Sequence, residues 1–353
     1  MGKADAISAA PADFSLTSPL ERAGLLATLG VAGALQFSIA VAQSLLAIAA
    51  LCWLGLLVTR RERFEVPRFF WLLMGFGGLT LISAAFSPEP RVSFIDSKQL
   101  LLFVIVPLVY RFATGSRGAL VLLVIISVGA ASAAFGIVQY GILHYDHLGQ
   151  RPRGTLGHYM TYSGLLMLVI GVALAQMLFG ARDRVWATLV LPALAVAVAL
   201  TFTRSAWVGA CAAAAVLLSL KDLRLTAVLP IVFAVFVALA PASVTQRFAS
   251  IFDLKDPTNR DRIAMFHEGE RMIRARPLVG VGPNMVEVLY AKYRDADAVE
   301  QINPHLHNVP MQIAAERGLP ALAVWVAFVC VVLFDLTRGL RRRTLPAVAA
   351  AAA

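Results

Sequence analysis

Charged side chains are scarce in this 353-residue chain: only 15% of its residues are Asp, Glu, Lys or Arg, whereas 59% are hydrophobic. Soluble globular domains carry roughly 25% charged residues. The mean hydropathy of +0.75 points the same way. The composition therefore excludes an ordinary soluble domain and indicates an integral membrane protein.

Cysteine is also scarce, and the three that are present, Cys52, Cys211 and Cys330, each lie inside an apolar run. They lack the spacing of metal ligands, so we expect packing roles and neither a disulfide nor a zinc site. The N-terminal 20 residues lack the basic start, apolar core and cleavage site of a signal peptide. The sequence gives no indication of a metal or a cofactor.

Apolar runs near the length that spans a bilayer as a helix recur about ten times. We therefore expect an all-α, polytopic membrane helix bundle of about ten transmembrane helices, with a long, partly helical extracytoplasmic loop. The expected organisation is a cytoplasmic tail over 1–20, a transmembrane bundle over 21–240, a periplasmic loop over 241–306, a histidine-containing helix with the last span over 307–337, and a basic, Ala-rich cytoplasmic tail over 338–353.

The net charge of +10 is explained by topology. With a cytoplasmic N-terminus, the inside segments and the N-terminal tail hold 16 of the 31 basic residues, whereas the short outside loops hold five. This is the bias of the positive-inside rule. The long outside segment is neutral, with nine basic and nine acidic residues. A basic patch for nucleic acid is therefore unnecessary, and no nucleic-acid partner is expected.

The long polar segment has internal order. Apolar residues between Ile263 and Arg274 recur at roughly helical spacing, which predicts an amphipathic helix. A rigid Pro- and Gly-rich turn follows over Pro277–Asn284, and a second short helix is expected from Asn284 to Tyr293. The turn lacks the preceding strand and the spacing of a phosphate-binding loop.

Arg204 stands out because it lies between two apolar helices in Thr203-Arg204-Ser205-Ala206-Trp207. An arginine near the middle of a bilayer costs about 2.5–3.5 kcal/mol on insertion scales, and less near the interface. One interpretation is a side chain that reaches up to the headgroups, with Trp207 as an interfacial anchor. The other is a fixed cation for an anionic substrate, because guanidinium matches phosphate in a bidentate way.

His307 and Asn308 end the polar segment, ahead of Gly318 and Pro320 and the last apolar run. If a short helix begins near Asn308, its N-terminal end lies beside His307, where unpaired N–H groups favour negative charge. His305 lies before that helix. The alternative for His307 is a membrane-surface histidine without chemistry.

Three motifs in order resemble the O-antigen ligase family: Thr203-Arg204-Ser205-Ala206-Trp207, then Arg262-x3-Phe266 ahead of Pro277-Leu278-Val279-Gly280-Val281-Gly282, then His307-Asn308-x9-Gly318. That family includes O-antigen polymerases and bacterial protein O-oligosaccharyltransferases. The resemblance covers about 151–320 and is weak in the first spans. Ala321 departs from the family signature, and family members usually continue through another pair of helices, so we expect a shortened C-terminus.

The resemblance implies a metal-independent, inverting glycosyltransferase of lipopolysaccharide biosynthesis, in the bacterial inner membrane with a periplasmic active site. The donor would be a glycan on undecaprenyl pyrophosphate, and the acceptor a hydroxyl of the lipid A core or another glycan. Arg204 and Arg262 would bind the pyrophosphate, and His307 would orient or deprotonate the acceptor hydroxyl. Asn308, Arg151 and Arg153 would contact the substrate, and membrane lipids would surround the bundle.

Two further functions stay open at this point. Within the same family, a polymerase or a protein O-oligosaccharyltransferase differs from a ligase only in its acceptor. Of another class, a transporter for a lipid-linked glycan or an anion would use Arg204 as a substrate site. Transporters typically place ionisable residues and broken helices near the midplane, whereas the polar groups of this chain gather at one predicted surface.

Overall fold

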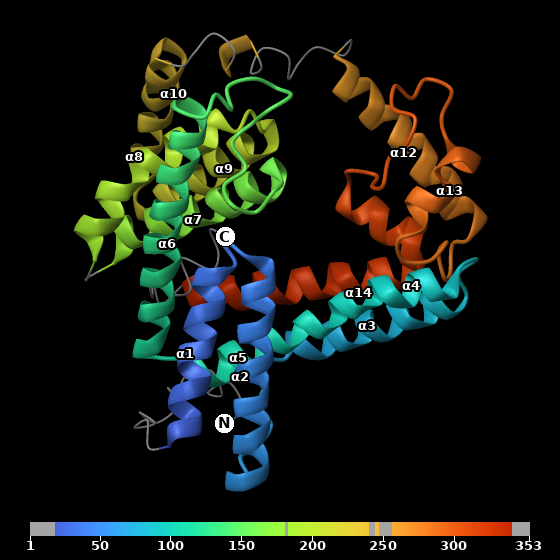
Figure 1. Ribbon diagram of the computed structural model, residues 1–353, viewed down its shortest axis with the longest axis horizontal. Helices are drawn as coiled ribbons and strands as arrows, with labels where there is room; N and C mark the ends of the chain where they lie inside the picture. The colour runs from blue at the N-terminus through green and yellow to red at the C-terminus, as the bar shows by residue number, and fades with distance from the viewer. Residues whose placement is uncertain (1–17, 181–182, 240–243, 247–255, 341–353) are drawn as a thin grey trace. The chain divides into compact units, whose positions relative to one another are not determined.

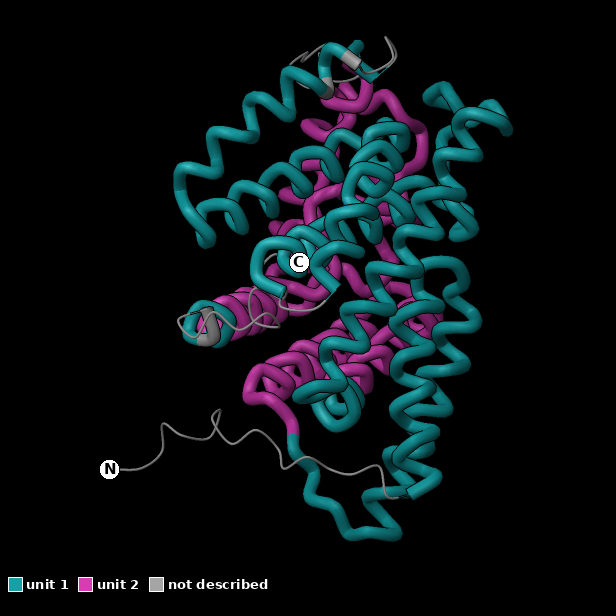
Figure 2. The backbone as a smooth tube through the Cα atoms, turned by 90° about the vertical axis from the view of Figure 1, so that its left-hand side faces the viewer, with its two compact units in different colours: residues 1–65, 107–248, 335–353 teal, residues 66–106, 249–334 magenta. Residues whose placement is uncertain are grey.

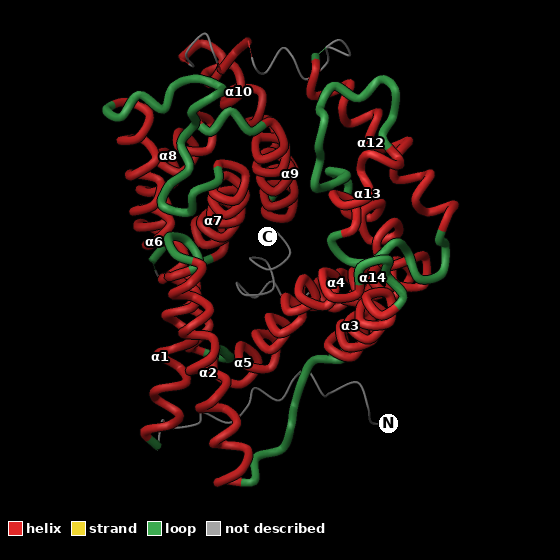
Figure 3. The backbone as a smooth tube through the Cα atoms, turned by 45° about the vertical axis from the view of Figure 1, so that its right-hand side comes forward, coloured by secondary structure: helices red, strands yellow, loops and turns green. Residues whose placement is uncertain are grey.

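The computed structural model describes residues 18–180, 183–239, 244–246 and 256–340. Most of the two predicted tails and part of the predicted 241–306 loop lie outside the described residues. Within the described residues the chain is helical and contains no β-strand (Figure 3). In the described part of the chain, six helices are long and apolar enough to cross a membrane, and three shorter apolar helices accompany them. The predicted all-α, polytopic membrane fold is confirmed; the number of spans stays a prediction.

The chain divides into two compact units, which Figure 2 colours separately. Unit 1 comprises residues 1–65, 107–248 and 335–353, and unit 2 comprises 66–106 and 249–334. The predicted domain organisation, which was drawn from hydropathy along the chain, stays a prediction. The grouping of 66–106 with 249–334 depends on packing between distant segments, which hydropathy does not report.

Unit 1 contains most of the long apolar helices (Figure 1). Its core is α7, which packs against α6, α8 and α9 and buries Tyr162, Leu166 and Ala173. Its helices are α1 (Pro19–Ala34), α2 (Ile39–Arg60), most of α5 (Ile105–Phe112), α6 (Ser116–Gly141), α7 (Tyr159–Phe179), α8 (Arg184–Leu200), α9 (Arg204–Lys221), the 3₁₀ turn η2 (Leu223–Ala227) and α10 (Val228–Leu239).

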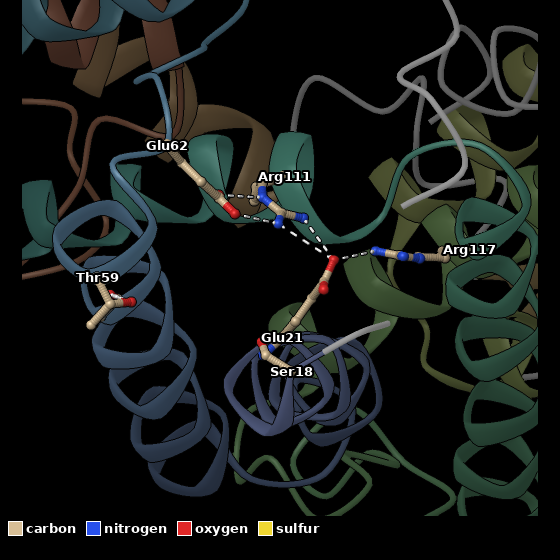
Figure 4. A network of polar contacts seen from close by, with 7 residues as sticks. Ser18, Glu21, Thr59, Glu62, Arg111 and Arg117 are labelled. Carbon is tan, nitrogen blue, oxygen red and sulfur yellow. Dashed lines mark hydrogen bonds and ion pairs between the residues drawn. The ribbon is translucent and has the colours of Figure 1, made fainter. Parts of the chain in front are cut away.

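A charge cluster connects four segments of unit 1 (Figure 4). Glu21 of α1 is 1% exposed, and its carboxylate lies 3.4 Å from Arg111 and 3.7 Å from Arg117. Arg111 also donates two hydrogen bonds, of 2.8 and 2.9 Å, to Glu62 in the segment after α2. A buried carboxylate without such partners would be strongly destabilising, so these arginines make the burial of Glu21 possible.

Unit 2 combines apolar helices with the polar segment. Its elements are α3 (Phe69–Ala85), α4 (Pro90–Asp96), the 3₁₀ helix η1 (Ser97–Val104), α12 (Pro257–Ala275), α13 (Met285–Tyr293) and α14 (Val309–Leu340), of which α14 continues into unit 1 after Phe334. Met265 and Met272 of α12 pack with Met285 of α13 and Ala315 of α14 in one buried cluster. The predicted amphipathic helix is therefore α12. Met265 and Met272 face this cluster, whereas the apolar residues Ile263 and Phe266 of the same helix are exposed.

Candidate functional site

The junction between α8 and α9 holds Arg204 in unit 1. Phe202 adopts a left-handed conformation (φ 54°), which turns the chain sharply between the two helices. The Trp207 indole donates a 3.0 Å hydrogen bond back to the carbonyl of Val198. Arg204 is the first residue of α9 and only 7% exposed. Trp207 is buried as well, so it packs inside the unit and does not extend toward lipid.

Arg151 lies close enough to Arg204 for the two charges to interact. Its guanidinium stacks 4.2 Å from the centre of the Tyr159 ring, and its Nε–H donates to the carbonyl of Leu148 over 2.8 Å. Burial lowers the pKa of Arg151, and the positive charge of Arg204 lowers it further, while Tyr159 acts in the opposite direction. Two neighbouring guanidinium groups repel each other, and a bound anion would relieve that repulsion.

Arg153 is positioned by its backbone. The N–H groups of Arg153 and Gly154 both donate to the side-chain oxygen of Gln139 in α6, over 3.0 and 2.9 Å. The Gln139 amide in turn donates to the carbonyl of Gly154 over 2.9 Å. The Arg153 side chain itself is exposed and lies over the ring of Tyr145. A glutamine inside an apolar helix thus fixes the path of the arginine-bearing loop.

Arg262 lies on α12, next to a buried carboxylate in unit 2. Asp261 is 6% exposed and accepts hydrogen bonds from the N–H groups of Val299 and Glu300, over 2.8 and 3.1 Å. Arg262 itself is exposed. The pairing of Asp261 with backbone donors fixes the rotation of α12, and this leaves the Arg262 guanidinium at the surface, where it can contact a ligand.

His307 precedes α14 and has a strained backbone. Its φ of 50° lies in the left-handed region, which is uncommon for residues other than glycine. The chain is fixed on both sides of it: Leu306 N–H donates to the Gln312 side chain over 2.7 Å, and Asn308 accepts from Met311 N–H over 3.1 Å. Asn308 therefore caps α14. The predicted helix start beside His307 is confirmed.

The pKa of His307 is lowered, chiefly because the surrounding chain removes part of its hydration. The positive charges of Arg262 and His305 lower this pKa further, and the carboxylate of Asp261 opposes them. His307 remains exposed. A solvent-accessible imidazole that is neutral at neutral pH is able to accept a proton.

The Pro- and Gly-rich turn packs backbone to backbone against α14. Gly318 interrupts that helix with φ 85° and ψ 167°. A Cβ atom at Gly318 would lie 2.2 Å from the carbonyl oxygen of Leu278, and one at Gly280 would lie 2.3 Å from the carbonyl carbon and oxygen of Glu316. Glycine is needed at both positions because no side chain fits between the two backbones.

The structure brings the predicted residues together in two groups. Arg151 and Arg204 interact in unit 1, and Arg262, His307 and Asn308 belong to unit 2. The convergence of Arg204 and Arg262 stays a prediction. Sequence reasoning did not single out four supporting residues: Gln139, Tyr159, Asp261 and Gln312. The two glutamines could have been found, because a polar side chain is unusual in their apolar surroundings.

The apolar helices define a multi-pass, helical membrane protein, which carries the two groups of polar residues described above. The family model described as O-antigen ligase matches residues 187–326. Over this region the chain is similar to the O-antigen ligase family, in agreement with the resemblance seen in its motifs. The match includes Arg204, Arg262 and His307, and Arg151 and Arg153 lie outside it. No curated protein matches the chain. The family indicates glycosyl transfer in general, from lipid-linked glycans to glycan acceptors.

Proposed function

We propose that this protein transfers a glycan from undecaprenyl pyrophosphate to an acceptor hydroxyl on the periplasmic face of the bacterial inner membrane, as an O-antigen ligase. The observation that carries the proposal is the setting of His307. A histidine in strained backbone, fixed by Gln312 and Asn308 and lying within electrostatic reach of Arg262, combines a proton acceptor with a fixed cation.

In the proposed reaction, neutral His307 accepts the proton of the acceptor hydroxyl. The hydroxyl oxygen forms a bond to the anomeric carbon of the donor sugar from the side opposite the pyrophosphate. The bond from that carbon to the pyrophosphate oxygen breaks, and the configuration inverts. Arg262 and Arg204 stabilise the negative charge on the departing pyrophosphate, worth about 3–4 kcal/mol for each well-placed donor.

Arg151 and Arg153 have a supporting part in this proposal. Arg151 adds a second positive charge beside Arg204, which suits a ligand that carries more than one negative charge. Arg153 lies on the same short loop with its side chain exposed, where it can contact the glycan. The side-chain oxygen of Asn308 is occupied in capping α14, so its side-chain amide N–H groups are the part that can contact the substrate.

The test is transfer by purified protein in liposomes supplied with a glycan on undecaprenyl pyrophosphate. Lipid A core, a second donor molecule and a Ser-containing peptide are offered in separate reactions. Transfer to the core supports the ligase, and transfer to the donor or the peptide indicates a polymerase or a protein O-oligosaccharyltransferase. An unchanged rate in chelator and an inverted anomeric signal in the product test the metal-independent, inverting mechanism. Movement of intact donor across the membrane without transfer would favour a transporter.

A further inference from the structure

The segment ahead of His307 is fixed to two helices. We call residues 294–303, between α13 and the His305-Leu306-His307 stretch, the strap. Asp261 of α12 binds the strap through the N–H groups of Val299 and Glu300 and through the Asn303 side chain at 3.3 Å. On its α13 side, the hydroxyl of Tyr290 donates to the carbonyl of Glu300 over 3.0 Å.

Two arginines hold strap carbonyls. Arg294 donates to the carbonyls of Ala298 and Glu300, over 2.7 and 3.2 Å. Arg271 of α12 donates to the carbonyls of Tyr293 and Arg294, over 3.3 and 3.4 Å, and pairs with the Asp295 carboxylate. Both guanidinium groups are therefore already engaged in keeping the strap in place.

Glu268 lies buried beside the strap. It follows Asp261 by seven residues, which places both carboxyl groups on one face of α12. Glu268 is 1% exposed, and its Oε1 has no hydrogen-bond partner among the described residues. The next residue, Gly269, lies against Leu306 and Met311, on either side of His307 in the sequence. This buried carboxyl is thus adjacent to the contacts that position the histidine.

The groups around Glu268 act on its charge in both directions. Burial is the largest influence and raises the pKa of Glu268 to about 7. The carboxylates of Asp261 and Asp295 raise this pKa as well, whereas Arg271 and Arg294 lower it. His267 lies 3.5 Å from Asp295 on the outer side of the same cluster. Glu268 is therefore largely neutral below about pH 7 and largely ionised above it.

We propose that Glu268 is a positioning residue for His307: its neutral form keeps the strap bound to α12 and α13, and its ionised form weakens this binding. A neutral carboxyl is compatible with the buried site, whereas a buried carboxylate requires a positive partner. The cations that act on Glu268 are Arg271 and Arg294, and an ionised Glu268 would compete with the strap carbonyls for these two guanidinium groups. Ionisation therefore weakens the contacts of the strap, which leads directly into the His305-Leu306-His307 stretch. The effect on transfer rests on the proposed function.

The test compares the wild type with Glu268→Gln, which keeps the shape and stays neutral at every pH. Wild-type transfer should fall as the pH rises above about 7, because above the pKa the neutral fraction of Glu268 decreases, approaching a tenfold loss per pH unit. Glu268→Gln should retain transfer at about pH 8. The alkaline limb of its pH–rate profile should therefore move up by about one pH unit or disappear. Identical alkaline limbs in the two proteins would overturn the proposal.

Hydrogen exchange of the Val299 and Glu300 amides gives a readout that does not depend on activity. Between about pH 6 and about pH 8 their protection, corrected for the intrinsic rate, should drop about tenfold in the wild type and stay constant in Glu268→Gln. Glu268→Asp, which keeps the charge, should behave like the wild type. Equal loss of protection in wild type and Glu268→Gln refutes the strap mechanism. Absent transfer with the expected exchange pattern refutes only the proposed reaction.

Discussion

The backbone N–H of Gly282 donates a hydrogen bond to the carbonyl oxygen of Glu316 over 2.8 Å. In an uninterrupted helix that carbonyl would accept from residue 320, which is a proline and has no N–H. Val281 N–H likewise reaches the carbonyl of Ala315 over 2.8 Å, and Leu319 N–H reaches that of Pro277 over 2.8 Å. The turn therefore supplies the partners that the break in α14 leaves unpaired.

This contact predicts that Gly280→Ala destabilises the protein by about 2–4 kcal/mol, because it adds a clash with Glu316 to a strained φ of 69°. Gly78→Ala in α3 of the same unit is the control, since a Cβ there meets nothing within 4 Å. Thermal unfolding of the purified variants measures the difference. Equal midpoints for the two substitutions would show that the turn can move aside.

His307→Ala should reduce glycan transfer by about 100- to 10,000-fold, the usual contribution of a general base. His305→Ala is the matched control, because it removes an exposed imidazole two residues away and should retain much of the activity. Transfer is measured at matched amounts of protein in the membrane. Equal rates for His307→Ala and the wild type would remove the histidine from the reaction.

Arg204→Lys should reduce transfer by about 100-fold, because an ammonium group cannot reproduce the planar, bidentate contact of guanidinium with a phosphate. The matched control is Arg184→Lys: Arg184 is the first residue of α8, as Arg204 is of α9, but it is exposed. If both variants transfer at the wild-type rate, Arg204 acts through packing and not through the donor.

The rate of transfer should fall on the acid side at a pH below 6.5, the ordinary histidine pKa, since burial and the charge of Arg262 lower the pKa of His307. Removing that charge in Arg262→Gln raises this pKa, so His307 becomes protonated at a higher pH and the residual activity fails earlier as the pH falls. The relative rate against pH, scaled to each variant's own maximum, measures the shift. A limb at the same pH in both proteins contradicts the assignment of His307 as base.

The predicted topology places the strap outside and the end of α9 inside. In a variant without its native cysteines, Ala296→Cys should react with an impermeant maleimide in intact cells, and Asp222→Cys should react only after permeabilisation. Both Ala296 and Asp222 are exposed in the structure. The reverse labelling would put His307 on the cytoplasmic face and end the periplasmic assignment.

Hydropathy predicted the helical membrane fold, and apolar spacing predicted the amphipathic helix that the structure has as α12, because both follow from local composition. The start of a helix near Asn308 was also expected, and α14 begins at Val309. The contacts between Gly282 and Glu316, and between Arg151 and Tyr159, lie outside such reasoning. Each depends on where a turn or loop meets a helix, and a single sequence does not report which backbones approach each other.

Gly318 also sets how deep α14 enters the bilayer. The 32 residues of Val309–Leu340 would form about 48 Å of straight helix, well beyond a hydrocarbon thickness of roughly 30 Å. The part after Gly318 already measures about 33 Å and fills that thickness alone. We therefore expect the part before Gly318 to lie in the headgroup layer. A thicker membrane should then reduce the tilt of the second part, while His307 keeps its depth among the headgroups.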